Sequence, residues 1–124
     1  MTAPEPRILV VKCTAGGEEP ERCAQAFTVA ATALAAGASV SLWLTGEAAW
    51  FAVPGRAEEF SLPHAAPLAD LRDAVLAGGR LTVCTQCAAR RGITEDDLID
   101  GVVIRGAASF VDEALTPGVQ ALVY

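Results

Sequence analysis

The stretch Leu81-Thr82-Val83-Cys84-Thr85-Gln86-Cys87-Ala88-Ala89-Arg90-Arg91-Gly92 changes its pattern at the centre. The first four residues predict a buried strand, and the residues after Cys84 predict a helix that stops at Gly92. A strand that passes directly into a helix is typical of parallel α/β sheets, in which ligands bind where the strands end. Two cysteines, Cys84 and Cys87, lie at this changeover. The stretch therefore predicts both the fold class and the place of a reactive thiol.

The rest of the chain alternates in the same way. Apolar runs predict further strands at 7–13, 38–44, 102–105 and 119–124. Helical spacing predicts helices at 21–36, 47–53, 68–77, 95–100 and 110–115, with Pro20 and Gly37 bounding the first, Thr94 capping the fourth and Ser109 capping the last. We expect residues 1–124 to form a single domain, a three-layer α/β/α sandwich with a mainly parallel five-stranded sheet.

Composition limits the classes of partner. The 124 residues are 52% apolar and only 19% charged, which is apolar-rich for a small domain. A net charge of −6 argues against non-specific binding to nucleic acid or to anionic membranes. Burial of the apolar surplus favours a homo-oligomer.

The chain shows no export or membrane pattern. Residues 1–7 lack a basic segment followed by an apolar one, so the four cysteines are expected to be reduced thiols in the cytoplasm. The uncharged run 23–44 is long enough to span a bilayer, but it is rich in alanine, serine and threonine and is broken at Gly37. We expect no membrane span.

The first long helix carries no charge after Arg22. Its polar residues beyond that point are Gln25, Thr28 and Thr32. A helix that covers a sheet normally presents a charged stripe to water. Either this helix is a small-residue helix with exposed alanine, or a second subunit covers its outer face, and the pattern favours the second.

The carboxyl ends of the strands should gather the candidate binding residues at one edge of the sheet. These are Thr14, Gly16, Gly17, Glu47, Thr85, Gln86, Arg90 and Arg91. Backbone N–H groups at the start of the helix after Cys84 would stabilise a thiolate or a bound anion, and a folded-back arginine would add to this. The loop at 14–17 lacks the glycine spacing of nucleotide sites, so no cofactor is expected. A single loop histidine, His64, supports no Ser-His-Asp site.

The Cys84–Cys87 pair allows several interpretations. It could be a dithiol–disulfide redox pair, or a single nucleophile, Cys84, with Cys87 as helper. Half of a zinc site is disfavoured, because Cys13, Cys23 and His64 lack the paired spacing of zinc ligands, and no metal is expected. Two buried cysteines that act as small hydrophobic residues remain the structural alternative.

With these residues placed, the chain resembles the DsrE-like family, which includes the DsrE and TusD sulfur-relay subunits and small proteins labelled predicted peroxiredoxins. The most specific match is Val83-Cys84 followed by Arg90-Arg91-Gly92, supported by Leu44-Thr45-Gly46-Glu47 and Trp50. The resemblance implies a trimer or hexamer in which Cys84 takes sulfane sulfur as a persulfide, as a sulfurtransferase-like carrier between donor and acceptor proteins.

Cys87 departs from the relay pattern. Its thiol could attack a persulfide on Cys84, release sulfide and leave a disulfide. A thiol redox protein that uses both cysteines, and a non-enzymatic oligomeric binding module, therefore stay as alternatives.

Overall fold

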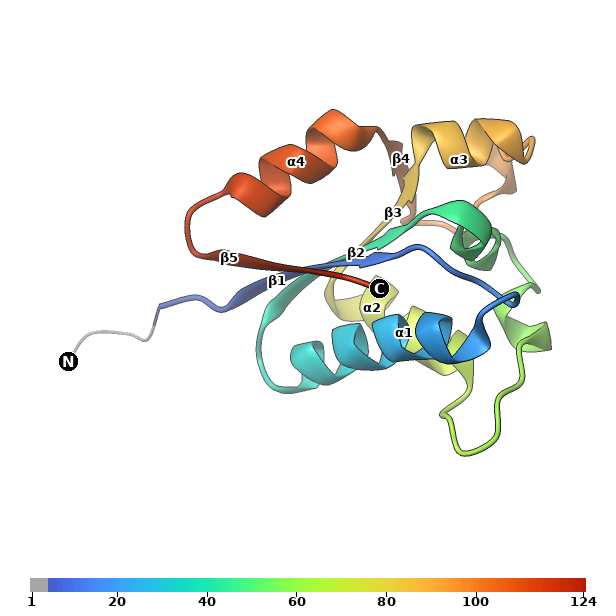
Figure 1. Ribbon diagram of the computed structural model, residues 1–124, viewed down its shortest axis with the longest axis horizontal. Helices are drawn as coiled ribbons and strands as arrows, with labels where there is room; N and C mark the ends of the chain where they lie inside the picture. Colours follow the sequence, from blue (N-terminus) through green and yellow to red (C-terminus); the bar gives the residue numbers. More distant parts are fainter. Residues whose placement is uncertain (1–4) are drawn as a thin grey trace.

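A computed structural model describes residues 5–124 as one twisted sheet with helices on both faces (Figure 1). The sheet has five strands in the order β4-β3-β2-β1-β5. The strands are β1 (Ile8–Cys13), β2 (Ser39–Leu44), β3 (Arg80–Cys84), β4 (Val103–Arg105) and β5 (Val119–Val123). Every neighbouring pair is parallel, so all five carboxyl ends meet at one edge. The expected three-layer sandwich is confirmed, with a sheet that is wholly parallel.

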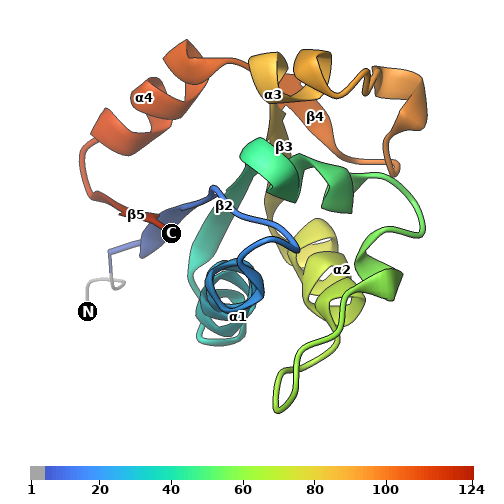
Figure 2. The ribbon, with the colours of Figure 1, turned by 45° about the vertical axis from the view of Figure 1, so that its right-hand side comes forward.

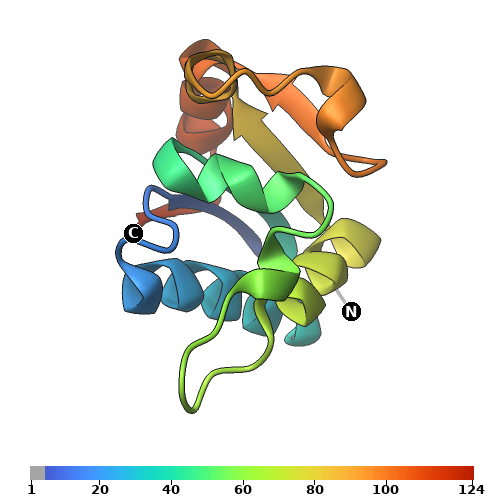
Figure 3. The same ribbon diagram turned by 90° about the vertical axis from the view of Figure 1, so that its right-hand side faces the viewer.

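Helices cover the two faces of this sheet unequally. The helices α1 (Pro20–Ala35) and α2 (Leu68–Gly78) pack on one face, and α3 (Thr85–Arg90) and α4 (Ala107–Leu115) lie on the other (Figure 2). Three short 3-10 helices, η1 (Gly46–Ala52), η2 (Ala57–Glu59) and η3 (Glu95–Asp97), complete the connections. Figure 3, which looks toward the carboxyl edge, shows η1 crossing in front of the sheet. None of the helices between residues 5 and 124 is long and apolar enough to cross a bilayer.

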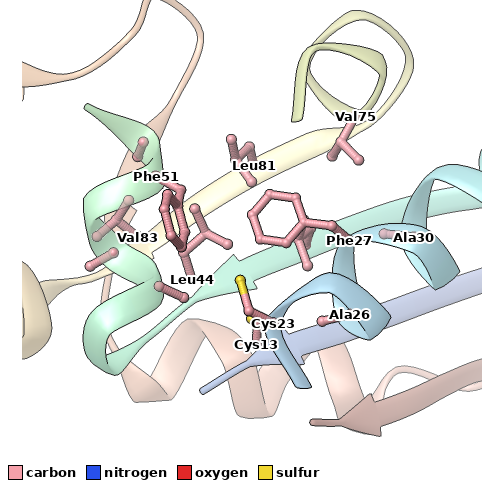
Figure 4. Close-up of a cluster of buried hydrophobic side chains, with 14 of the residues drawn as sticks. Cys13, Cys23, Ala26, Phe27, Ala30, Leu44, Phe51, Val75, Leu81 and Val83 are labelled. Carbon is pink, nitrogen blue, oxygen red and sulfur yellow. The ribbon is translucent and has the colours of Figure 1, made fainter. Parts of the chain in front are cut away.

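The main core lies between the sheet and the pair α1 and α2 (Figure 4). Alternate residues of the strands point into it, including Val11, Leu42 and Val83. Phe27 of α1 meets Phe51 of η1 edge to face, with ring centroids 6.2 Å apart. Each large apolar side chain buried in this way stabilises the fold by about 1.5–3 kcal/mol.

The opposite face is less well covered. No residue of α4 is fully buried. The large apolar side chains exposed between residues 5 and 124 are Val111 and Leu115 of α4 and Leu122 and Val123 of β5, with Leu115 77% exposed. On α1, by contrast, the residues left in solvent include Gln25, Thr28 and Thr32. The large apolar side chains exposed among residues 5–124 therefore lie on α4 and β5, and none of them is on α1. By register, Leu122 points to the α1 side of the sheet and Val123 to the α4 side.

Several sequence-based boundaries need correction. Ser109 does not cap the last helix, because α4 already begins at Ala107 with the extended Gly106 as its N-cap. The carbonyl of Gly106 accepts the N–H of Ser109 at 3.1 Å, and alanine at the next two positions favours the helix. The helix expected at 47–53 is a 3-10 helix.

The short helix expected at 95–100 is a single 3-10 turn. Thr94 is its N-cap as predicted, and the Asp97 carboxylate accepts the backbone N–H of Thr94 at 2.8 Å. This reciprocal cap closes the turn on itself, and the chain is extended again at Leu98. Elsewhere, Pro20 and Gly37 bound the first helix as expected, and Gly37 has a φ of +93°.

Candidate functional site

Cys84 is the last residue of β3 and the N-cap of α3, so it sits at the carboxyl edge of the sheet. The side chain is partly exposed. Its thiol donates a hydrogen bond to Oε1 of Gln86 at 3.3 Å. Thr85 and Gln86 are both exposed beside it. The thiol is therefore reachable from solvent at the place where α/β sheets bind ligands.

The surroundings of Cys84 favour its thiolate. Partial burial raises the pKa of this thiol, but the backbone N–H and the thiol of Cys87, the backbone N–H of Gln86 and the ammonium group of Lys12 together lower it below its ordinary value. A lower pKa increases the thiolate fraction at neutral pH, and the thiolate is the nucleophilic form.

Cys87 has a different environment although it lies one helical turn away. It is buried, with 8% of its surface exposed. Its sulfur accepts the backbone N–H of Gly46 at 3.2 Å, so it faces the start of η1. The Cys87 thiol nevertheless contributes to the lowered pKa of Cys84. The pair thus consists of one open and one covered thiol.

Arg91 folds back over α3 but binds groups other than the Cys84 thiol. Its Nε donates to Oε2 of Glu47 at 2.7 Å, and its Nη1 donates to the carbonyl of Cys87 at 3.0 Å. The same carboxylate oxygen accepts Nε1 of Trp50 at 3.1 Å. The hydrogen bond and the charge of Arg91, and to a lesser extent the hydrogen bond from Trp50, lower the pKa of Glu47. Glu47 therefore balances the charge of Arg91, while Arg90 is exposed.

The loop after β1 is held against the same edge. Both Oγ1 and the backbone N–H of Thr14 donate to the carbonyl of Tyr124, at 2.6 and 2.9 Å. A β-carbon at Gly16 would lie 2.8 Å from the backbone of Glu47, so this close approach requires glycine. Gly17 has open space beside it. The fold therefore brings Gly16 next to Glu47, whereas Thr14 ties this loop to the end of the chain at Tyr124.

The cavity beside these loops does not contain the cysteine. It has a volume of about 270 Å³ and is lined by Gly17, Glu47, Trp50 and Arg56 among others. Arg56 stacks over the Trp50 ring at 4.3 Å. Cys84 is not part of its lining, so its thiol is presented at the surface of the edge rather than from the floor of this cavity.

The model of the DsrE/DsrF-like family matches residues 8–122 of the chain. The chain belongs to this family. Among curated proteins, it is 31% identical over 108 residues to the uncharacterized protein MJ0760 of Methanocaldococcus jannaschii. The match covers 86% of the chain but only 39% of that relative's length.

Solved structures agree on the fold. The ychN protein from E. coli superposes with a TM-score of 0.75 at 18% identity, covering 97% of this chain and all of the other. MTH1491 from Methanobacterium thermoautotrophicum gives a TM-score of 0.65 at 12% identity, with 97% and 100% covered. BT1422 from Bacteroides thetaiotaomicron gives 0.62 at 14% identity, with 95% of each chain covered. These similarities show that the chain has the same fold as these proteins.

Lys12, which no sequence pattern singled out, is a charged residue that contributes to the lowered pKa of Cys84. Lys12 of β1 is half-buried, and its Nζ lies 4.6 Å from the centroid of the Phe110 ring. The signal was present, because Lys12 interrupts an otherwise apolar strand at a position that alternation places opposite the main core. Its closeness to Cys84 depends on strand order, which was not predicted.

The structure also brings together two cysteines that are apart in the chain. Cys13 at the end of β1 and Cys23 in α1 are both fully buried, and Figure 4 shows their sulfur atoms next to each other. A hydrogen bond with Cys13, together with burial, raises the pKa of Cys23. Between residues 5 and 124 no three His, Cys, Asp or Glu side chains converge as a metal site would require, and His64 lies in an exposed loop.

Proposed function

We propose that this DsrE/DsrF-like chain is a sulfur carrier that holds sulfane sulfur as a persulfide on Cys84. The observation that carries the proposal is the partly exposed thiol of Cys84 at the carboxyl end of β3, with its pKa lowered by its surroundings. Family membership supports a role related to sulfur relay. The same thiol would be the nucleophile of a sulfurtransferase-like reaction.

The transfer step is a thiol exchange at sulfur. The Cys84 thiolate attacks the outer sulfur of a donor persulfide, R–S–SH. A bond forms between Sγ of Cys84 and that sulfur, the S–S bond of the donor breaks, and the donor leaves as the thiolate R–S⁻. Atoms and charge balance with Cys84–S–SH as the product. The reverse step on an acceptor thiolate passes the sulfur onward.

Cys87 offers the main alternative. Attack of a Cys87 thiolate on the inner sulfur of the Cys84 persulfide would form a Cys84–Cys87 disulfide and release HS⁻. The spacing of the two cysteines favours this reaction, because Cys84 is the N-cap of α3 and Cys87 lies in its first turn. Against it, Cys87 is buried and its sulfur is held by the N–H of Gly46. Carriage is therefore the first proposal, and redox chemistry by the pair is the second.

Intact-mass analysis separates these outcomes. We expect the reduced protein, incubated with a sulfane donor and a sulfurtransferase, to gain the mass of one sulfur atom. Cys84→Ser should lose this gain, whereas Cys87→Ser, the matched control in the same helix, should keep it. A gain that survives Cys84→Ser would overturn the assignment. Release of sulfide with an 84–87 disulfide would support the alternative.

The proposed setting is a homo-oligomer in the cytoplasm that exchanges sulfur with donor and acceptor proteins. Exposed apolar side chains on α4 and β5 support self-association, and the family resemblance suggests a trimer or hexamer. Light scattering at micromolar concentration tests this, with Leu115→Glu expected to reduce the mass of the assembly and a monomeric wild-type protein contradicting it. A purely binding role predicts instead that blocking the thiols leaves partner binding unchanged.

A further inference from the structure

Lys12 is the single lysine of the chain, which has nine basic residues in all. It is the next-to-last residue of β1 and is half-buried. The ion pairs formed between residues 5 and 124 belong to Arg72 and Arg91, and none includes Lys12. Among residues 5–124 this partly buried ammonium group therefore has no carboxylate partner, although the chain has more acidic than basic residues.

Strand register places Lys12 on the same face of the sheet as Cys84. Lys12 pairs with Trp43 of β2, and Trp43 pairs with Thr82 of β3. Paired residues in neighbouring strands share a face, and so do residues two apart in one strand. Cys84 follows Thr82 by two positions. Both side chains therefore project toward the α4 side, near the carboxyl edge.

The position of the ammonium group is fixed from α4. The Phe110 ring lies under Nζ at 4.6 Å and meets Trp43 edge to face, with centroids 5.5 Å apart. Nε1 of Trp43 in turn donates to Oε2 of Glu113 at 3.1 Å. Such a cation–π contact holds a lysine without neutralising its charge. Phe110, Trp43 and Glu113 therefore orient Lys12 while leaving its charge available.

We propose that Lys12 is a charge-stabilising residue of the Cys84 site, which favours the thiolate before sulfur arrives and the persulfide anion afterwards. The part that concerns the persulfide rests on the proposed function, and the part that concerns the thiolate does not. Lys12 acts through space on Cys84 and takes no covalent part in the transfer.

Other groups around Cys84 supply less free positive charge. Arg91 is balanced by Glu47. Arg105, the register partner of Cys84 on β4, is exposed, so solvent screens its charge. Glu113 of α4 accepts Nε1 of Trp43 and is a negative charge on this side of the sheet. Burial raises the pKa of Cys84, and Lys12 is the one cationic side chain among the groups that lower it; the others are the two backbone N–H groups and the Cys87 thiol.

The test measures Cys84 alkylation by iodoacetamide against pH, with peptide mapping to follow this cysteine alone. The reagent is uncharged, so its rate reports the thiolate fraction. We expect Lys12→Met to move the profile to higher pH and to slow labelling near neutral pH roughly two- to threefold, by loss of one nearby charge. Lys12→Arg should restore most of the rate. Arg90→Met, which removes an exposed charge from α3, should leave the profile unchanged.

A second measurement tests whether Lys12→Met acts through the lost charge or through a change in the packing of α4. Reductive methylation of the single lysine keeps its charge and acetylation removes it, so only the acetylated protein should show the shift. An unshifted profile in both Lys12→Met and the acetylated protein would overturn the inference, as would an equal shift in Arg90→Met. Persulfide loading of the wild type is scored separately. If the wild type takes up no persulfide sulfur but Lys12→Met still shifts the alkylation profile, only the proposed function is contradicted. If loading is normal but the profile does not shift, only the role of Lys12 is contradicted.

Discussion

The molecule contains two pairs of cysteines with opposite surroundings. Cys84 and Cys87 lie three residues apart at the carboxyl edge of the sheet, and the first of them reaches solvent. Cys13 and Cys23 meet only through folding, in the core between β1 and α1, where neither is exposed. Spacing in the chain is thus a poor guide to reactivity. Access, and the groups that favour a thiolate, distinguish the two pairs.

Labelling of the native protein should separate the pairs most strongly. We expect iodoacetamide to modify Cys84 at least ~100-fold faster than Cys13 or Cys23, because exposing a core thiol requires an opening of several kcal/mol, and each 1.4 kcal/mol is a factor of ten. Peptide mapping over time gives the rates. In concentrated denaturant the difference should collapse. Comparable labelling of Cys13 in the folded protein would mean that its pocket opens readily and that the comparison fails.

Substitutions in the buried pair should lower the free energy of unfolding more than substitutions in the Cys84–Cys87 pair. Cys23→Ser places a hydroxyl in the core and should lower the free energy of unfolding by about 1–3 kcal/mol. Cys84→Ser, at a partly exposed position, should change it by no more than about 0.5 kcal/mol. Urea unfolding measures both, and Cys23→Ala separates lost packing from the buried hydroxyl. An equal loss in Cys23→Ser and Cys84→Ser would contradict the division into a structural and a reactive pair.

The smallest effect concerns the ion pair behind α3. Glu47→Gln removes the charge that balances Arg91 and should cost about 0.5 kcal/mol, since the Glu47 carboxylate is half exposed. Because Arg91 lowers the pKa of Glu47, this contribution is present above the ordinary carboxyl range and is lost as the pH falls through the lowered value. Urea unfolding at neutral and acid pH checks this sign. A large change in Cys84 alkylation would show that Arg91 acts on the thiol after all.

Much of the fold could be predicted because its signals are local. The apolar run that ends at Cys84 and the helix after it depend on residue type and spacing alone. The misplaced start of α4 shows the limit of such signals, because Ser109 is a good cap and only the extended backbone at Gly106 decided otherwise. The uncharged α1 favoured a second subunit over its outer face, and this stays a prediction. Phe27 and the small residues beside it are buried in the core, whereas the exposed large apolar side chains of residues 5–124 lie on α4 and β5.

The site divides in the same way. Cys84 and its place at the end of β3 follow from the sequence, since a strand-to-helix junction in a parallel sheet has one geometry. Which charge lies near Cys84 does not follow, because Arg90 and Arg91 are close to it in the chain while Lys12 is far away. Arg91 turned to Glu47, and Lys12 came near only because β1 lies two strands from β3 in the order β4-β3-β2-β1-β5.

By itself, the sequence determined the parallel α/β class, the family and the cysteine at the strand end, since each depends on local pattern and short spacing. Only the tertiary structure decided that Cys87 is covered, that Cys13 and Cys23 form a second pair, and that Lys12 faces the site. The physical reason is that burial and electrostatic contact depend on distances through space. Those distances are set by strand order and register, which no local pattern in this chain encodes.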